Sequence, residues 1–155
     1  MQMGIKALLN MRGAQEAVAG TTLAATELWQ MDGMMKDDQE RVFPVQGDGY
    51  LHNTALNYLR KEGVTININD GPATAEHICH LFEMSIVKVF TGVADGAGSG
   101  KVYAYPFPLA SAQVPATYTI EGGDDIEVGE ASGCFAEEVK LKWAAGEELT
   151  CAAKI

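Results

Sequence analysis

Short segments in which apolar and polar residues alternate recur along the chain and constrain its fold more than any other feature. The clearest is Val64–Asn69, and the same alternation is present over 116–121, 135–143 and 149–155. Because successive side chains of a strand point to opposite faces, each segment is predicted to be a half-buried β-strand. Ala145 and Gly146 supply a turn between the last two, which predicts a hairpin.

One helix is expected, over about residues 72–85. Asp70 or Gly71 can cap it, and Pro72 suits its first turn. Its apolar positions follow the three- and four-residue spacing of an amphipathic helix. They are Ala75, Ile78, Cys79, Phe82 and Ile86.

The remaining segments are less regular. Residues 91–100 and 122–133 each contain several glycines, and both stretches are predicted to be loops. The strand expected over 101–107 ends at a proline, which suits a sheet edge. Residues 13–50 fit either a helix or an extended arm, so no state is assigned to them.

The chain has the composition of a single globular domain, 1–155. It has 155 residues, of which 47% are apolar and 21% charged, and this length supports a core without disulfides. Its three cysteines cannot all pair within one chain, and no CxxC is present, which suits a reducing compartment. Neither a secretory signal nor a membrane span is recognisable, so an unexported chain with no membrane partner is expected.

The charge balance argues against a nucleic-acid-binding site. The net charge is −10, from 11 basic and 21 acidic residues, and residues 121–155 carry nine of the acids but three of the bases. Binding to phosphates needs clustered Lys and Arg. The sequence therefore predicts no specific DNA or RNA binding.

No catalytic motif is complete. The run Gly96–Lys101 lacks the first glycine and the last hydroxyl of a phosphate loop, and a strand rather than a helix follows it. His77 and His80 with Cys79 form the one metal-like cluster, but two surface histidines with a core cysteine are the favoured interpretation. The paired carboxylates are interpreted as a solvated face, because acid–base catalysis needs a buried carboxyl. The sequence predicts neither an enzyme nor a cofactor or metal.

Two stretches of the second half carry a resemblance to a known family. They are Pro115–Asp125, a strand ending in an acidic glycine turn, and Phe135–Ala153, a charged strand joined by a small-residue turn to another. Together with the earlier order of strand, Gly71–Pro72 and helix, and with an N-terminal run from Lys6 to Gly20–Thr21, they resemble the tail tube (major tail) proteins of long-tailed bacteriophages.

The resemblance implies a small β-sandwich or barrel with one flanking helix and extended loops or arms, assembling as six-membered rings that stack into a tube. Six copies carry about −60 in total, so acids facing the bore would repel the phosphates of passing DNA. Candidate positions for lining the lumen or contacting the next subunit are Asp124, Asp125, Glu127, Glu130 and Glu138. The implied partners are further copies of the chain and tape-measure, tail terminator and distal tail proteins. The resemblance also implies that double-stranded DNA passes through the tube without specific binding. Assembly in the host cytoplasm and a final place in the virion tail are implied too.

Three other classes stay open. A tube protein of a secretion or contractile system would also assemble as rings but carries no DNA. A head–tail connector or decoration protein would show another symmetry or a place on the capsid. A small metal-dependent hydrolase using His77, His80 and the acidic loop would contain bound metal, lost on His77→Ala.

Overall fold

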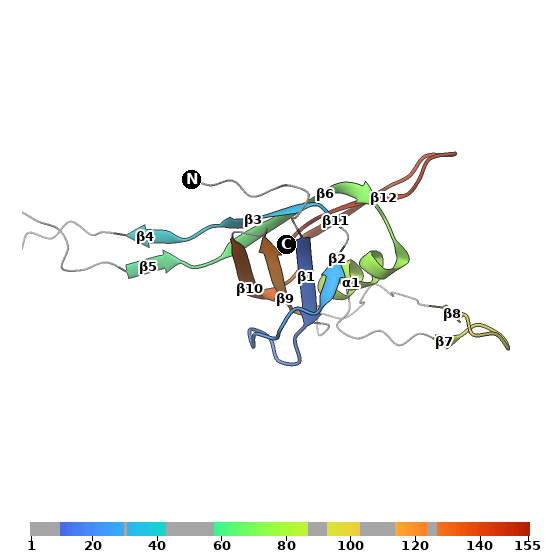
Figure 1. Cartoon of the computed structure of the whole chain (residues 1–155), viewed down its shortest axis with the longest axis horizontal. Helices are drawn as coiled ribbons and strands as arrows, with labels where there is room; N and C mark the ends of the chain where they lie inside the picture. Colours follow the sequence, from blue (N-terminus) through green and yellow to red (C-terminus); the bar gives the residue numbers. More distant parts are fainter. Residues whose placement is uncertain (1–9, 30, 43–57, 87–92, 103–113, 124–126) are drawn as a thin grey trace, which may run out of the picture.

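Two four-stranded antiparallel sheets form the body of the protein (Figure 1). A computed structural model describes residues 10–29, 31–42, 58–86, 93–102, 114–123 and 127–155. Sheet 1 has the order β10 (Val128–Cys134), β9 (Tyr118–Gly123), β1 (Asn10–Gln15), β2 (Glu27–Trp29). Sheet 2 has the order β11 (Glu138–Lys142), β12 (Thr150–Lys154), β6 (Val64–Pro72), β3 (Gly33–Asp37). Strands of the two sheets cross steeply in Figure 1.

The core lies between the two sheets. Alternation along β9 turns Tyr118 and Ile120 inward, and alternation along β6 does the same for Ile66 and Ile68; each of the four is at most 3% exposed. The rest of the buried cluster comprises Met11, Trp29, Leu81, Met84, Ala116, Ala136, Cys151, Ala153 and Ile155. The expected fold class, a mainly β small sandwich with one helix, is therefore confirmed.

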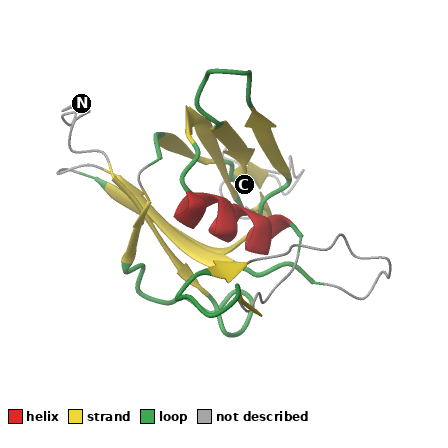
Figure 2. Ribbon diagram, turned by 90° about the vertical axis from the view of Figure 1, so that its right-hand side faces the viewer, coloured by secondary structure: helices red, strands yellow, loops and turns green. Residues whose placement is uncertain are grey.

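Helix α1 (Ala75–Ser85) closes one side of the sandwich (Figure 2). It begins three residues later than expected, because β6 continues to Pro72, which pairs with Thr150 of β12. The cap is consequently Thr74, whose hydroxyl accepts the His77 amide, instead of Asp70 or Gly71. Among the described residues, no helix combines the length and hydropathy needed to cross a bilayer.

The predicted loop over 122–133 is wrong in its second part. Residues 128–134 form β10, paired with β9 through Gly129↔Gly122 and Glu130↔Glu121. A Cβ at Gly129 would lie 2.9 Å from the Met35 sulfur, so a larger residue here would displace that flexible side chain. The register shifts after Ala131, and Gly133 takes a left-handed φ of +70°. Because of these irregularities, the segment lacks the sequence pattern of a regular strand.

Two-stranded hairpins extend beyond the sandwich (Figure 1). The ribbon of β3 and β6 continues outward as β4 (Glu40–Val42) paired with β5 (Tyr58–Lys61), and the Asp38 amide donates to Gly63 between the two ladders. The predicted hairpin of β11 and β12 is confirmed. A third, of β7 (Val93–Ala94) and β8 (Lys101–Val102), contains the glycine run, while the rest of the strand expected over 101–107 lies outside the described residues.

Residues 13–50, left without an assigned state, are described over 13–29 and 31–42. They contribute the end of β1, an exposed loop at 17–24, β2, β3 and β4. The loop is held against the outer face of sheet 1, where the Leu23 amide donates to Thr119 and the Ala25 amide to Glu121.

Candidate functional site

The candidate acids do not form one cluster. Glu127 precedes β10 and Glu130 lies on it, whereas Glu138 lies on β11 of the other sheet. Glu138 is paired with Lys140, at 3.0 Å between Oε2 and Nζ. Asp124 and Asp125 lie outside the described residues. Of the predicted residues, the structure therefore brings together Glu127 and Glu130.

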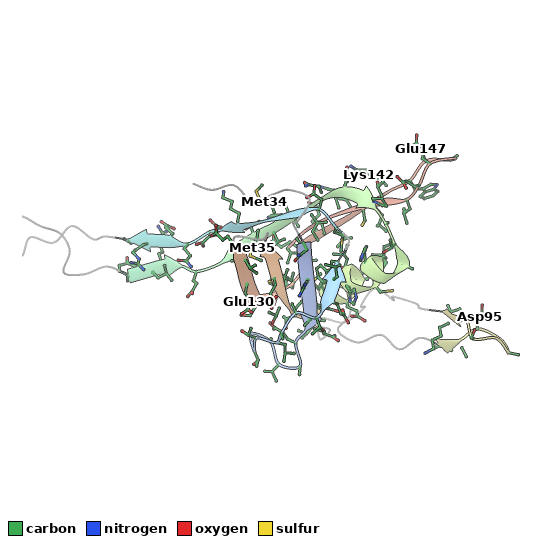
Figure 3. The ribbon with its side chains drawn as sticks, viewed as in Figure 1. Met34, Met35, Asp95, Glu130, Lys142 and Glu147 are labelled. Carbon is green, nitrogen blue, oxygen red and sulfur yellow. The ribbon has the colours of Figure 1, made fainter. Side chains whose placement is uncertain are left out.

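Residues of both sheets, Glu127 and Glu130 among them, line an open groove of about 1230 Å³. By register Glu130 lies opposite Glu121, so its side chain is on the outer face of sheet 1. Figure 3 shows Met34 and Met35 on opposite sides of β3, with Met35 on the side of β10. The residues around the groove include the apolar Leu28, Met31, Met34 and Met35 and the acidic Asp32, Asp37, Glu127 and Glu130. By register Leu28 lies on the outer face of sheet 1 and Met34 on the outer face of sheet 2. Sequence reasoning missed the methionines and Asp32, because they belong to the segment without an assigned state, and it interpreted Asp37 as part of a solvated face.

Each sheet has two edge strands that are paired on one side only within the described part of the chain. They are β10 and β2 in sheet 1, and β11 and β3 in sheet 2. On β11, Lys140 and Lys142 provide the charged side chains that discourage pairing with another chain. The seven residues of β10 include no lysine, arginine or proline, so its edge is the less protected of these two.

The β4–β5 ribbon exposes apolar and basic side chains together. Tyr58 is 56% exposed and Leu59 38%. Arg41 is exposed, and Arg60 forms an ion pair with Glu40 at 3.2 Å. An isolated two-stranded ribbon is at best marginally stable in water. Covering this ribbon with another surface would therefore stabilise it.

A buried carboxylate that sequence reasoning missed, Glu16, connects the 17–24 loop to sheet 1. Glu16 is 2% exposed. Its Oε2 accepts the Gly20 amide at 2.7 Å, while its Oε1 accepts the Gly133 amide at 2.8 Å and the Thr119 hydroxyl at 2.9 Å. Burial acts to raise the pKa of Glu16, but these hydrogen bonds outweigh it, and its pKa is lowered overall.

The histidine pair differs from the expectation of two surface histidines with a core cysteine. His77 is buried at 4% exposure, and Cys79 is only half-buried. The reason is that the face of α1 bearing His77 and His80 turns toward the sandwich. His80 Nδ1 lies 3.1 Å from the Tyr118 hydroxyl, its Nε2 lies 3.2 Å from Glu27, and its ring stacks on Trp29.

This histidine network has the character of a structural contact. The Tyr118 hydroxyl donates to Glu83 at 2.7 Å, so the network ties α1 to β9 and β2. Within the ranges that the structure describes, no three His, Cys, Asp or Glu residues are grouped so that they could hold a metal ion.

No family model, curated protein or solved structure matches this chain. The groove, the sheet edges and the exposed ribbon are therefore the features on which a functional proposal has to rest.

Proposed function

We propose that this chain is a structural, non-enzymatic subunit of the tail tube of a long-tailed bacteriophage. In this proposal, copies associate into rings, six-membered by resemblance, and the rings stack into a conduit for DNA during infection. The mainly β sandwich with one flanking helix supports the proposal, because it is the architecture that the sequence resemblance implies.

The observation that carries the proposal is the exposed β4–β5 ribbon beside sheet edges paired on one side. Tyr58 and Leu59 are exposed on a ribbon that has no third strand in the described part of the chain. Identical neighbours can complete such edges, and a repeated heterologous contact generates either a closed ring or a filament.

The charge of the chain is compatible with a conduit. A net −10 per copy gives an assembled ring a strong negative field, which disfavours adsorption of DNA phosphates. In the proposed tail, the further partners are tape-measure, terminator and distal tail proteins, and assembly takes place in the host cytoplasm.

Negative-stain electron microscopy of the purified chain, with light scattering over a concentration series, tests the proposal. We expect annuli or striated hollow filaments, and a mass that increases with concentration. A monomer at every concentration and ionic strength would contradict it.

A further inference from the structure

We propose that protonation of His80 controls how firmly strand β2 is held against helix α1, so that β2 loosens as the pH rises through the range in which histidine titrates. This inference concerns a single chain and does not depend on the proposed self-assembly, so either can fail without the other. Within the described part of the chain, β2 is an edge strand of sheet 1 and its neighbour is β1. Loosening of β2 would therefore uncover the edge of β1.

The imidazole of His80 is contacted by side chains from two strands. It stacks on Trp29 of β2, with ring centroids 5.8 Å apart and planes 21° from parallel, and it meets the ring of Tyr118 of β9 edge-on. Its Nδ1 lies 3.1 Å from the Tyr118 hydroxyl, and its Nε2 lies 3.2 Å from a carboxylate oxygen of Glu27. The groups that can exchange protons or charge with the ring are thus Glu27 of β2, Tyr118 of β9 and, through that hydroxyl, Glu83 of α1.

The hydrogen bonds around the ring use both of its nitrogens as donors. The Tyr118 hydroxyl donates its one proton to Glu83 at 2.7 Å, so toward Nδ1 its oxygen can only accept. The Glu27 carboxylate has no proton to donate, so it can only accept from Nε2. A neutral imidazole carries one N–H and satisfies one of these acceptors, whereas the imidazolium satisfies both. The arrangement is therefore complete only when His80 is protonated.

Strand β2 depends on this imidazole because its other attachments are few. It is three residues long, and its pairing with β1 joins three residues of each strand. The indole N–H of Trp29 is buried and has no acceptor among the described residues, so it does not anchor the strand. The same ring binds Glu27 and stacks on Trp29, and a cation beside an indole is attracted to its face. Loss of the second ring proton therefore weakens two contacts of β2 at once.

The direction of the pH effect follows from where the proton is held. With β2 in place, the ring donates to a carboxylate and a hydroxyl; with β2 detached, Nε2 faces water, and a free histidine titrates at about pH 6.5. The contribution of the proton is consequently present in full below that pH and is lost as the pH rises above it. The Glu27 side chain is 56% exposed, so we expect a change of about two- to fivefold in the equilibrium between attached and detached β2.

Hydrogen exchange of the full chain, followed by NMR, tests the proposal. Protection factors, which correct for the intrinsic pH dependence of exchange, should fall about two- to fivefold at the β2 amides between about pH 5.5 and about pH 8. Those of β12 should change less. The fall should be smaller in Glu27→Gln and absent in His80→Gln. The matched control is Glu40→Gln, which removes an exposed acid from an ion pair with Arg60 and should behave like the original chain.

The nitrogen chemical shifts of the ring report the protonation state directly. At about pH 7, where a free histidine is mostly neutral, a larger fraction of His80 should carry both ring protons than in Glu27→Gln. The proposal is overturned if His80 is a single neutral tautomer at that pH, or if β2 is equally protected at both pH values. It is also overturned if His80→Gln keeps the pH effect, since His77 or His52 would then be its source. Should His80→Gln fail to fold, Glu27→Gln at an exposed side chain still decides: an unchanged pH effect in that variant would contradict the proposal.

Discussion

Replacing Glu16 should destabilise the fold more than replacing any exposed acid, because one buried carboxylate accepts hydrogen bonds from three donors. Its two oxygens accept the amides of Gly20 and Gly133 and the hydroxyl of Thr119 at 2.7–2.9 Å. Both glycines have left-handed φ values, +76° and +70°. The carboxylate therefore fixes the loop and the β10 bulge together.

The magnitude follows from the three hydrogen bonds. A hydrogen bond to a charged group contributes about 1.5–3 kcal/mol, and losses in one network are not additive. We expect Glu16→Ala to lower the free energy of unfolding by about 3–5 kcal/mol, because two amides and the buried Thr119 hydroxyl lose a charged acceptor. Glu16→Gln keeps an oxygen for Gly133 and Thr119 but places an amide against the Gly20 N–H, so it should cost about 1–3 kcal/mol.

Urea unfolding of the monomer, followed by tryptophan fluorescence, measures both losses. Trp29 is 2% exposed and reports on the core. With a slope of about 2 kcal/mol per molar urea, Glu16→Ala should shift the midpoint by about 1.5–2.5 M. Glu121→Gln, which weakens a single 3.3 Å hydrogen bond from Ala25, is the control and should shift it little. Equal midpoints for the original chain and Glu16→Ala would refute the stabilising role assigned to Glu16.

The pH dependence gives a second readout. Since the pKa of Glu16 is lowered in the fold, the unfolded chain takes up the proton first, at about pH 4.3. The stability from this group is therefore present above that pH and is lost as the pH falls through the folded pKa. The difference between the original chain and Glu16→Gln should shrink on acidification; a constant difference would contradict the assignment.

Three further predictions concern other parts of the fold. Gly13→Ala should lower the free energy of unfolding by about 1–3 kcal/mol, because the added Cβ would overlap the Trp29 ring. The near-ultraviolet circular dichroism should change as well. Gly63→Ala, which has open space around it, is the control and should change neither. Tyr118→Phe removes the hydroxyl shared by His80 and Glu83 and should lower stability by about 1–2 kcal/mol in thermal unfolding, an effect that the exposed Tyr58→Phe should not reproduce. Burial and the nearby Glu16 raise the pKa of the Cys134 thiol to about 11, so its alkylation should be slow at pH 8 and faster in Glu16→Gln; an unchanged rate would argue against that coupling.

The fold could be predicted where burial produces a period in the sequence. Ile66 and Ile68 in β6 alternate with exposed asparagines, and α1 shows helical spacing. In β10 the inward positions are Gly129 and Ala131, which carry no hydrophobic signal. Pairing with β9 makes that segment a strand, and a tertiary contact of this kind leaves no local trace.

The candidate site could be predicted only in part for a related reason. Glu127 and Glu130 stand out as acids near glycines, but the groove also includes Met31 and Met35, which lie almost a hundred residues earlier. Glu16 gave no signal, because its donors lie on β9, on β10 and in the loop at Gly20. Each site is a property of how the sheets pack.

The distribution of charge between the two sheets limits how the proposed tube can be oriented. By register, Lys36, Lys140, Lys142 and Lys154 share the outer face of sheet 2, and the last three are paired with Glu138, Asp70 and Glu137. This face is nearly neutral, so the excess of acids in a chain of net −10 lies on the rest of the molecule. DNA phosphates are attracted by clustered lysines and repelled by acids. If DNA crosses the bore without adsorbing, we therefore expect the more acidic surfaces, and not the nearly neutral outer face of sheet 2, to line it.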